Sequence, residues 1–194
     1  MTTTFHPFFR PIVAVAILVT GIFASLFAFG EDADQAALVL ALTKAKVSLA
    51  DGLKQSSKGT EVPISAKFEL DDKKQLSLSV YTAEKGLAVD AEHNVLKELA
   101  GSPEKTPWAP EAEVFKDIPH VARASEHLTV TSVSKLSLLD VVSKVQKAHP
   151  GTVLSITPTV HKGRPVFVVQ VVNKGKVGEY NYDAITGNPS AMKK

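Results

Sequence analysis

Residues 46–53 read Lys-Val-Ser-Leu-Ala-Asp-Gly-Leu, and residues 135–142 read Lys-Leu-Ser-Leu-Leu-Asp-Val-Val. In both stretches an aspartate follows a serine by three positions, and apolar residues lie around the pair. A serine that precedes a helix accepts a hydrogen bond from the backbone N–H three residues on, and an acidic side chain there returns one. The two stretches therefore predict helix starts at Ser48 and Ser137. Their recurrence 89 positions apart (137 − 48 = 89) indicates two copies of one small module.

The second copy has the clearer pattern of secondary structure. His149-Pro150-Gly151 ends the helix that starts at Ser137. Apolar and polar residues then alternate with a period of two, which is typical of half-buried antiparallel strands. The expected strands cover residues 152–160, 165–172 and 177–182.

The first copy repeats this order with weaker signals. A helical region over residues 34–53 restarts at Ser48, and three strands are expected over residues 62–70, 75–82 and 87–91. The intervening segment 101–134 contains four prolines, which break long elements, so it is predicted to be a linker. Within it, a short helix is expected over residues 111–116 and an extra strand over residues 128–133.

The predicted fold class follows from these elements. We expect an α+β protein of two tandem α-β-β-β modules, each a helix packed on a three-stranded antiparallel sheet. The modules cover residues 34–100 and 135–194. Because a module of about 60 residues buries too little surface to be secure alone, the two are expected to pack together or against another chain.

The N-terminal thirty residues are predicted to be a signal peptide. Arg10 precedes an uncharged apolar run over residues 12–30, and Ala28 and Gly30 suit the −3 and −1 positions of a cleavage site. The alternative is an uncleaved anchor, since a helix of this length spans roughly 28 Å. Both interpretations export the remaining chain, so the expected location is periplasmic or secreted. Membrane contact is expected only if the leader is retained.

Composition excludes several classes of function. Beyond residue 30 there are 22 − 1 = 21 basic and 20 acidic side chains, a net charge of +1, which argues against binding to nucleic acid. The chain has no cysteine, so disulfides, thiol catalysis and thiolate metal sites are excluded.

No catalytic or cofactor-binding motif is present in the sequence. His120, Glu126 and His127 come nearest to a metal-ligand set, but the chain has no His-x-x-x-His or Glu-x-x-His pair. No serine lies in Gly-x-Ser-x-Gly, and Ser48 and Ser137 are explained as helix caps. We therefore predict no catalytic residues, no metal and no other cofactor, and a protein that is not an enzyme.

Residues 135–189 resemble a PepSY domain. The resemblance lies in Leu-Ser-Leu-Leu-Asp at 136–140, Ala-His-Pro-Gly at 148–151, Gly-Arg-Pro-Val-Phe-Val-Val-Gln-Val at 163–171 and Tyr-Asp-Ala-Ile-Thr-Gly at 182–187. It implies a helix on a three-stranded antiparallel sheet in an exported protein, with no catalytic residues. The family-motif residues are Gly163, Arg164, Pro165, Asp183, Ala184, Thr186 and Gly187.

Residues 46–99 resemble a second, more divergent copy. Asp90, Ala91 and Asn94 are the expected equivalents of the closing Asp-Ala-x-Thr-Gly motif. Asparagine can replace the glycine because it tolerates left-handed backbone angles better than most residues.

The resemblance implies a binding or modulatory protein, since similar domains occur in the propeptides of thermolysin-like proteases and a role in restraining peptidases has been proposed for the family. The expected partner is a protein or peptide, with an envelope peptidase as the leading candidate. Pro165, which opens a strand, suggests a sheet edge that an extended peptide could join. The alternatives are a structural or sensory module that pairs with a membrane partner or itself, and a carrier of a small ligand or metal.

Overall fold

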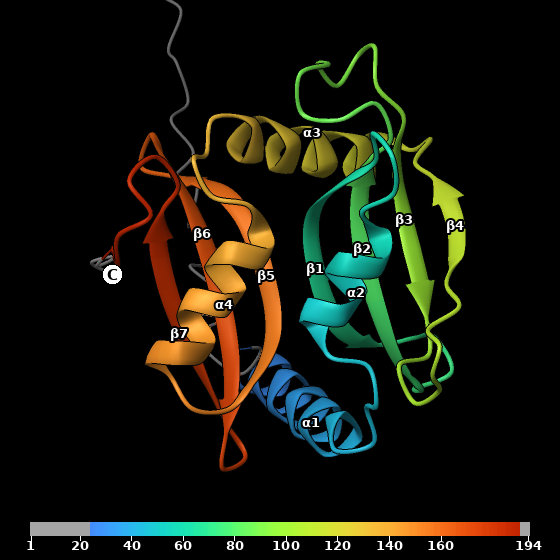
Figure 1. Ribbon diagram of the computed structural model, residues 1–194. Coiled ribbons are helices and arrows are strands. Elements are labelled where there is room, and N and C mark those ends of the chain that lie inside the picture. The colour runs from blue at the N-terminus through green and yellow to red at the C-terminus, as the bar shows by residue number, and fades with distance from the viewer. Residues whose placement is uncertain (1–23, 191–194) are drawn as a thin grey trace, which may run out of the picture.

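A computed structural model describes the backbone of residues 24–190 and the side chains of residues 33–190 (Figure 1). Four helices and seven strands make up this region. In chain order they are α1 (Ala24–Leu42), α2 (Leu49–Ser56), β1 (Val62–Leu70), β2 (Leu76–Ala83), β3 (Leu96–Gly101), β4 (Glu111–Val114), α3 (Ile118–Ser132), α4 (Leu138–Ala148), β5 (Thr152–His161), β6 (Arg164–Asn173) and β7 (Lys176–Asp183). None of the described helices is long and apolar enough to cross a membrane.

All seven strands form one antiparallel sheet in the order β4-β3-β2-β1-β5-β6-β7. The α+β class is confirmed, with the element order helix-strand-strand-strand in each half: α2-β1-β2-β3 and α4-β5-β6-β7. The two expected three-stranded sheets are joined through β1 and β5, which makes them halves of one continuous surface.

A local two-fold axis relates the two halves at this junction. Both β1 and β5 shift register at a bulge, between Pro63 and Ser65 and between Val153 and Ser155. Counted from these bulges, Ala66 and Ile156 hold the same position, and they are paired with each other across β1 and β5. Equivalent strands that pair antiparallel through equivalent residues are related by a two-fold rotation, as in a symmetric dimer.

The helices divide between the two faces of the sheet. α2 and α4 lie side by side on one face, over a core that includes Val80, Ile156 and Phe167 (Figure 1). Tyr81 follows Val80 in β2 and therefore points to the opposite face. There it packs in a second apolar cluster with Ala124 of α3. α3 and α1 lie at opposite ends of the sheet (Figure 1).

The two predicted helix starts are confirmed in detail. Ser48 accepts a hydrogen bond from the Asp51 N–H, and the Asp51 carboxylate accepts one from the Ser48 N–H. Ser137 and Asp140 make the same reciprocal pair at the start of α4. Two residues of sequence therefore determine where each helix begins.

Three sequence-based element predictions are wrong. Residues 87–91 form a loop, and the third strand of the first half is β3. The Asn94 amide stabilises this loop through hydrogen bonds to its backbone. It donates to the carbonyls of Gly86 and Val89 and accepts from the Lys85 N–H. Residues 111–116 were expected to be helical, but they contribute β4, which pairs with β3.

Residues 128–133 were expected to form a strand, but residues 128–132 belong to α3. This helix starts at Asp117, whose carboxylate accepts from the His120 N–H, and Pro119 lies in its first turn. The Thr131 hydroxyl donates to the His127 carbonyl, which fits a β-branched residue into the helix. The segment 101–134, predicted to be a linker, thus contains both β4 and α3.

Candidate functional site

The motif residues of the C-terminal half form a closed turn after β7. One carboxylate oxygen of Asp183 accepts from the Ile185 N–H at 3.0 Å and from the N–H and hydroxyl of Thr186 at 2.8 and 3.0 Å. Hydrogen bonds from the Thr186 backbone and hydroxyl lower the pKa of Asp183. The aspartate is therefore an ionised acceptor that organises the turn.

Gly187 fits this turn against the entrance to α4. Its φ of +70° is the left-handed conformation that glycine adopts readily. Its carbonyl accepts from the Lys144 ammonium at 2.6 Å, and an added Cβ would lie 2.5 Å from Leu136 Cδ1. The glycine therefore provides both a backbone angle and room for a neighbouring side chain.

The two motif segments are brought together in space. The buried Ala184 donates its N–H to the Pro165 carbonyl at 2.9 Å. Gly163, with φ of +75°, turns the chain between β5 and β6, and Arg164 pairs with His161 at the start of β6. These residues lie in turns and at strand ends. Pro165 does not mark an edge, which corrects that prediction, because β6 lies between β5 and β7.

The expected first-copy equivalents lie at a different topological position. Asp90, Ala91 and Asn94 precede β3, whereas Asp183 ends β7. Asp90 does accept from the N–H of a residue three positions on, at 3.0 Å, so the likeness to Asp183 is local.

The ladders identify the true counterpart of Asp183. Val80 faces Leu99 in the first half, as Val169 faces Tyr180 in the second. Three positions beyond Leu99 lies Ser102, as Asp183 lies three beyond Tyr180. The Ser102 hydroxyl accepts from the Glu104 N–H at 3.3 Å, a weaker version of the Asp183 turn.

Within the described part of the chain, one edge of the sheet is open along part of β7. In an antiparallel strand, alternate residues turn both backbone groups away from the neighbouring strand. Asn181 and Asp183 do so, because they bond to Ser190 and Asn188 of the following segment. The same alternation turns the N–H and C=O of Val177 and Glu179 outward. We call this stretch, residues 177–179, the β7 edge.

A hollow lies beside the β7 edge. It has a volume of about 510 Å³ and is bounded by the end of α4, the second half of β7 and the segment that follows the motif turn. The His149 and Tyr180 rings stack within it, with centroids 3.6 Å apart and planes 18° apart. Glu179 lines the hollow, so an extended chain on the β7 edge would have room there for a side chain.

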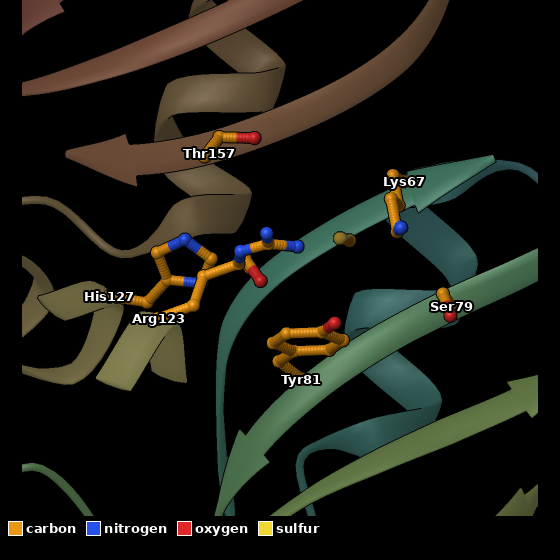
Figure 2. Close-up of a pocket in the computed structure, with 8 residues that line it drawn as sticks. Lys67, Ser79, Tyr81, Arg123, His127 and Thr157 are labelled. Atoms are coloured by element: carbon orange, nitrogen blue, oxygen red, sulfur yellow. The ribbon is translucent and has the colours of Figure 1, made fainter. Parts of the chain in front are cut away.

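A second cavity lies on the opposite face of the sheet from α2 and α4, where α3 crosses β1, β2 and β5. We call it the sheet pocket; its volume is about 220 Å³ (Figure 2). All of its lining residues except Ala66 have a polar group in the side chain. The lining residues are Ser65, Ala66, Lys67, Ser79, Tyr81, Arg123, His127 and Thr157.

His127 is the most constrained group in the sheet pocket. Its side chain is only 5% exposed, and burial lowers its pKa from 6.5 to about 4, so the ring is neutral at pH 7. Its Nδ1 atom is buried and has no hydrogen-bond partner among the described residues. An unpaired buried polar atom is costly, which makes this one a candidate ligand contact.

Charged groups surround the sheet pocket on the side of β1, β2 and β3. Lys67 pairs with Glu69, with nitrogen and oxygen 2.5 Å apart. The Ser79 hydroxyl donates to Glu98, whose pKa is raised by burial and then by the nearby Glu69 carboxylate. Burial also raises the pKa of Tyr81, whose hydroxyl lies within reach of the Arg123 guanidinium.

Two of the three residues considered for a metal site bond to other groups, and the third, His127, lines the sheet pocket. His120 bonds to Asp117 at 2.7 Å, and Glu126 accepts from the Thr159 hydroxyl and the Val160 N–H. No group of three potential ligands gathers anywhere within the described side chains.

Sequence reasoning missed both the β7 edge and the sheet pocket. The alternation in β1 and β2 predicts that one side of each strand, with its polar residues, faces solvent, and nothing in these strands predicts the cover that α3 provides. The only available signal was the helical spacing of Arg123 and His127, four residues apart.

Residues 135–189 match the family model described as "Peptidase propeptide and YPEB domain", PepSY. The match covers α4, β5, β6, β7 and the motif turn. No curated protein matches the chain.

A solved structure titled as a putative lipoprotein from Clostridium difficile 630 is similar at 10% identity with a TM-score of 0.37. The similarity covers 77% of this chain and 93% of that one. At this TM-score the likeness carries no argument about function.

Proposed function

Because residues 135–189 are a PepSY domain, we propose that the chain is an exported, non-enzymatic protein that restrains a peptidase of the cell envelope. Its contact with the peptidase is the β7 edge. The proposal is supported by the outermost strand of this domain, in which the backbone N–H and C=O groups of Val177 and Glu179 have no hydrogen-bond partner among the described residues. Propeptide-type domains act by occupying a peptidase, and an open edge offers a way to do so.

The contact is strand addition. An extended segment of the peptidase lies antiparallel or parallel to β7 and pairs with the four outward backbone groups of Val177 and Glu179. A hydrogen bond contributes a net of about 0.5–1.5 kcal/mol, so the four together contribute roughly 2–6 kcal/mol. That alone gives weak binding, so the hollow beside Tyr180 supplies the additional contact with a side chain.

Proline substitution tests the contact. Glu179→Pro removes an outward N–H and leaves the ladder to β6 intact, since the Glu179 N–H does not point toward β6. The matched control is Ala112→Pro on β4, at the other edge of the sheet. The Phe115 N–H bonds inward to Leu96, so alternation turns the Ala112 N–H outward as well.

The assay is hydrolysis of a chromogenic peptide by a thermolysin-type metallopeptidase, and by the peptidases of an envelope fraction from the producing organism. We expect the wild-type protein and Ala112→Pro to slow hydrolysis equally, and Glu179→Pro to lose at least tenfold in potency. If the wild-type protein slows none of these peptidases, peptidase restraint is wrong. If Glu179→Pro inhibits as well as the control, the β7 edge is not the contact.

A further inference from the structure

We infer that the sheet pocket binds a small organic monocarboxylate, with the Arg123 guanidinium as its cation and the His127 imidazole as a hydrogen-bond partner. The sheet pocket is built from β1, β2, β5 and α3 and shares no residue with the β7 edge. The inference is therefore independent of the proposed contact with a peptidase.

The size of the sheet pocket fits a ligand comparable to an amino acid. Water occupies roughly 30 Å³ per molecule in the liquid, so a cavity of about 220 Å³ has room for several waters or for one small organic molecule. The pocket is smaller than the usual site for a drug-sized ligand. Part of a peptide, such as its last residue, would also fit.

The balance of charge favours an anion. Lys67 and Arg123 are the two cations that line the sheet pocket. Lys67 is already neutralised by Glu69. Among the described residues, no carboxylate forms an ion pair with Arg123. The neutral Tyr81 hydroxyl lies within its reach but leaves the positive charge uncompensated. Such a guanidinium binds a carboxylate through two parallel hydrogen bonds.

His127 provides a second and separate indication of a ligand. The side chain is more than nine-tenths buried, lines the sheet pocket, and has a buried Nδ1 without a partner. Figure 2 shows the imidazole next to the Arg123 side chain. A neutral imidazole donates through one nitrogen, so a carboxylate held by Arg123 can accept from the ring as well.

The surroundings favour one negative charge over two. Glu98 reaches the sheet pocket through Ser79, and Glu69 lies beside Lys67. These carboxylates repel a phosphate dianion more than a monocarboxylate. The hydroxyls of Ser65, Tyr81 and Thr157 are neutral groups that can bind the remaining polar atoms of the ligand.

Calorimetric titration of the whole protein tests the inference. The probes are N-acetylalanine and trialanine, which carry the same carboxylate as a free acid and as a peptide terminus, and their C-terminal amides. We expect saturable binding of at least one acid below about 10 mM and at least tenfold weaker binding of its amide. Preference for N-acetylalanine identifies a free acid as the source, and preference for trialanine identifies a peptide end.

Two variants assign the binding to the sheet pocket. Arg123→Gln is expected to weaken binding of the acid at least tenfold, and Arg164→Gln, at the turn before β6, to leave it unchanged. Both side chains are exposed, and a thermal melt of each variant checks that it folds. In the wild-type protein, binding should raise the pKa of His127, read from its ring resonances by NMR, since a nearby negative charge favours the imidazolium.

Three outcomes of the titrations overturn the inference. They are an absence of saturable binding of either acid, equal binding of acid and amide, and tighter binding of inorganic phosphate than of the acids. Equal weakening by Arg123→Gln and Arg164→Gln also contradicts it, because the binding would then reflect general surface charge.

Discussion

Replacing Gly187 by alanine should destabilise the protein for two reasons, its left-handed backbone conformation and its close contact with Leu136, and a comparison with Gly175 separates them. Gly187 has a φ of +70°, and an added Cβ would lie 2.5 Å from Leu136 Cδ1 and 3.2 Å from Leu136 Cγ. Gly175, in the hairpin between β6 and β7, has a φ of +78° and nothing within 4 Å of the same position. The two glycines therefore share the backbone requirement, and only Gly187 has the close neighbour.

The expected destabilisation follows from these geometries. A left-handed conformation costs a residue with a Cβ about 1–2 kcal/mol, and both variants incur it. Alanine also makes the unfolded chain less flexible than glycine does, which offsets about 0.4–1 kcal/mol of this destabilisation in both variants. Forcing Leu136 aside adds about 1–3 kcal/mol at Gly187 alone, the typical cost of overpacking. The free energy of unfolding should therefore fall by about 1–3 kcal/mol more in Gly187→Ala than in Gly175→Ala.

Urea denaturation followed by circular dichroism measures both free energies. A second background, Leu136→Ala, tests the contact itself, because the neighbouring Cγ and Cδ1 atoms are absent there. There Gly187→Ala should cost no more than Gly175→Ala does in the wild-type protein. Equal destabilisation by the two glycine substitutions in the wild-type background would contradict the expected difference, since the contact with Leu136 would then contribute nothing to the free energy of unfolding.

Two further predictions concern the helix caps and the buried histidine. Ser48→Ala and Ser137→Ala should each lower the free energy of unfolding by about 1 kcal/mol in urea denaturation, because each serine caps its helix in the same way; a cost at only one site would contradict the equivalence of the two starts. His127 has a lowered pKa of about 4, so the unfolded chain binds a proton between pH 6.5 and 4 that the folded chain does not. Stability from this group is therefore complete above pH 6.5 and decreases as the pH falls toward 4, by roughly 3 kcal/mol in total. Carboxylates with lowered pKa values, such as Glu126 and Asp183, also lose stabilisation at the acid end of this range, so both proteins should lose stability. Urea denaturation should show a loss that is roughly 3 kcal/mol larger in the wild-type protein than in His127→Gln, and parallel curves would contradict the assignment.

The local features of the fold could be predicted from the sequence. Ser48 and Ser137 determine helix starts through contacts within three residues, and the strands of the C-terminal half follow from strict alternation between turns. These signals are contained in short stretches of chain, so no knowledge of the rest of the molecule is needed to interpret them.

The remaining features depend on contacts between distant segments. Residues 128–132 alternate like a strand but are helical, because Ala124 and Leu128 pack on the sheet beside Tyr81. Residues 87–91 form a loop and residues 96–101 form the third strand instead, because the Asn94 amide donates hydrogen bonds to backbone carbonyls of the loop. Residues from four elements line the sheet pocket, so no single stretch of sequence predicts it. The pairing of β1 with β5 is likewise not predicted by the residue pattern of either strand.

Hydrogen exchange at the Val177 and Glu179 amides measures whether a peptidase pairs with the β7 edge. In the protein alone these N–H groups point away from β6, so they should exchange rapidly, while the Gly178 and Tyr180 amides within the ladder are protected. In complex with a peptidase that the protein inhibits, the Val177 and Glu179 amides should become protected. Inhibition without any change in their exchange would contradict strand addition at the β7 edge.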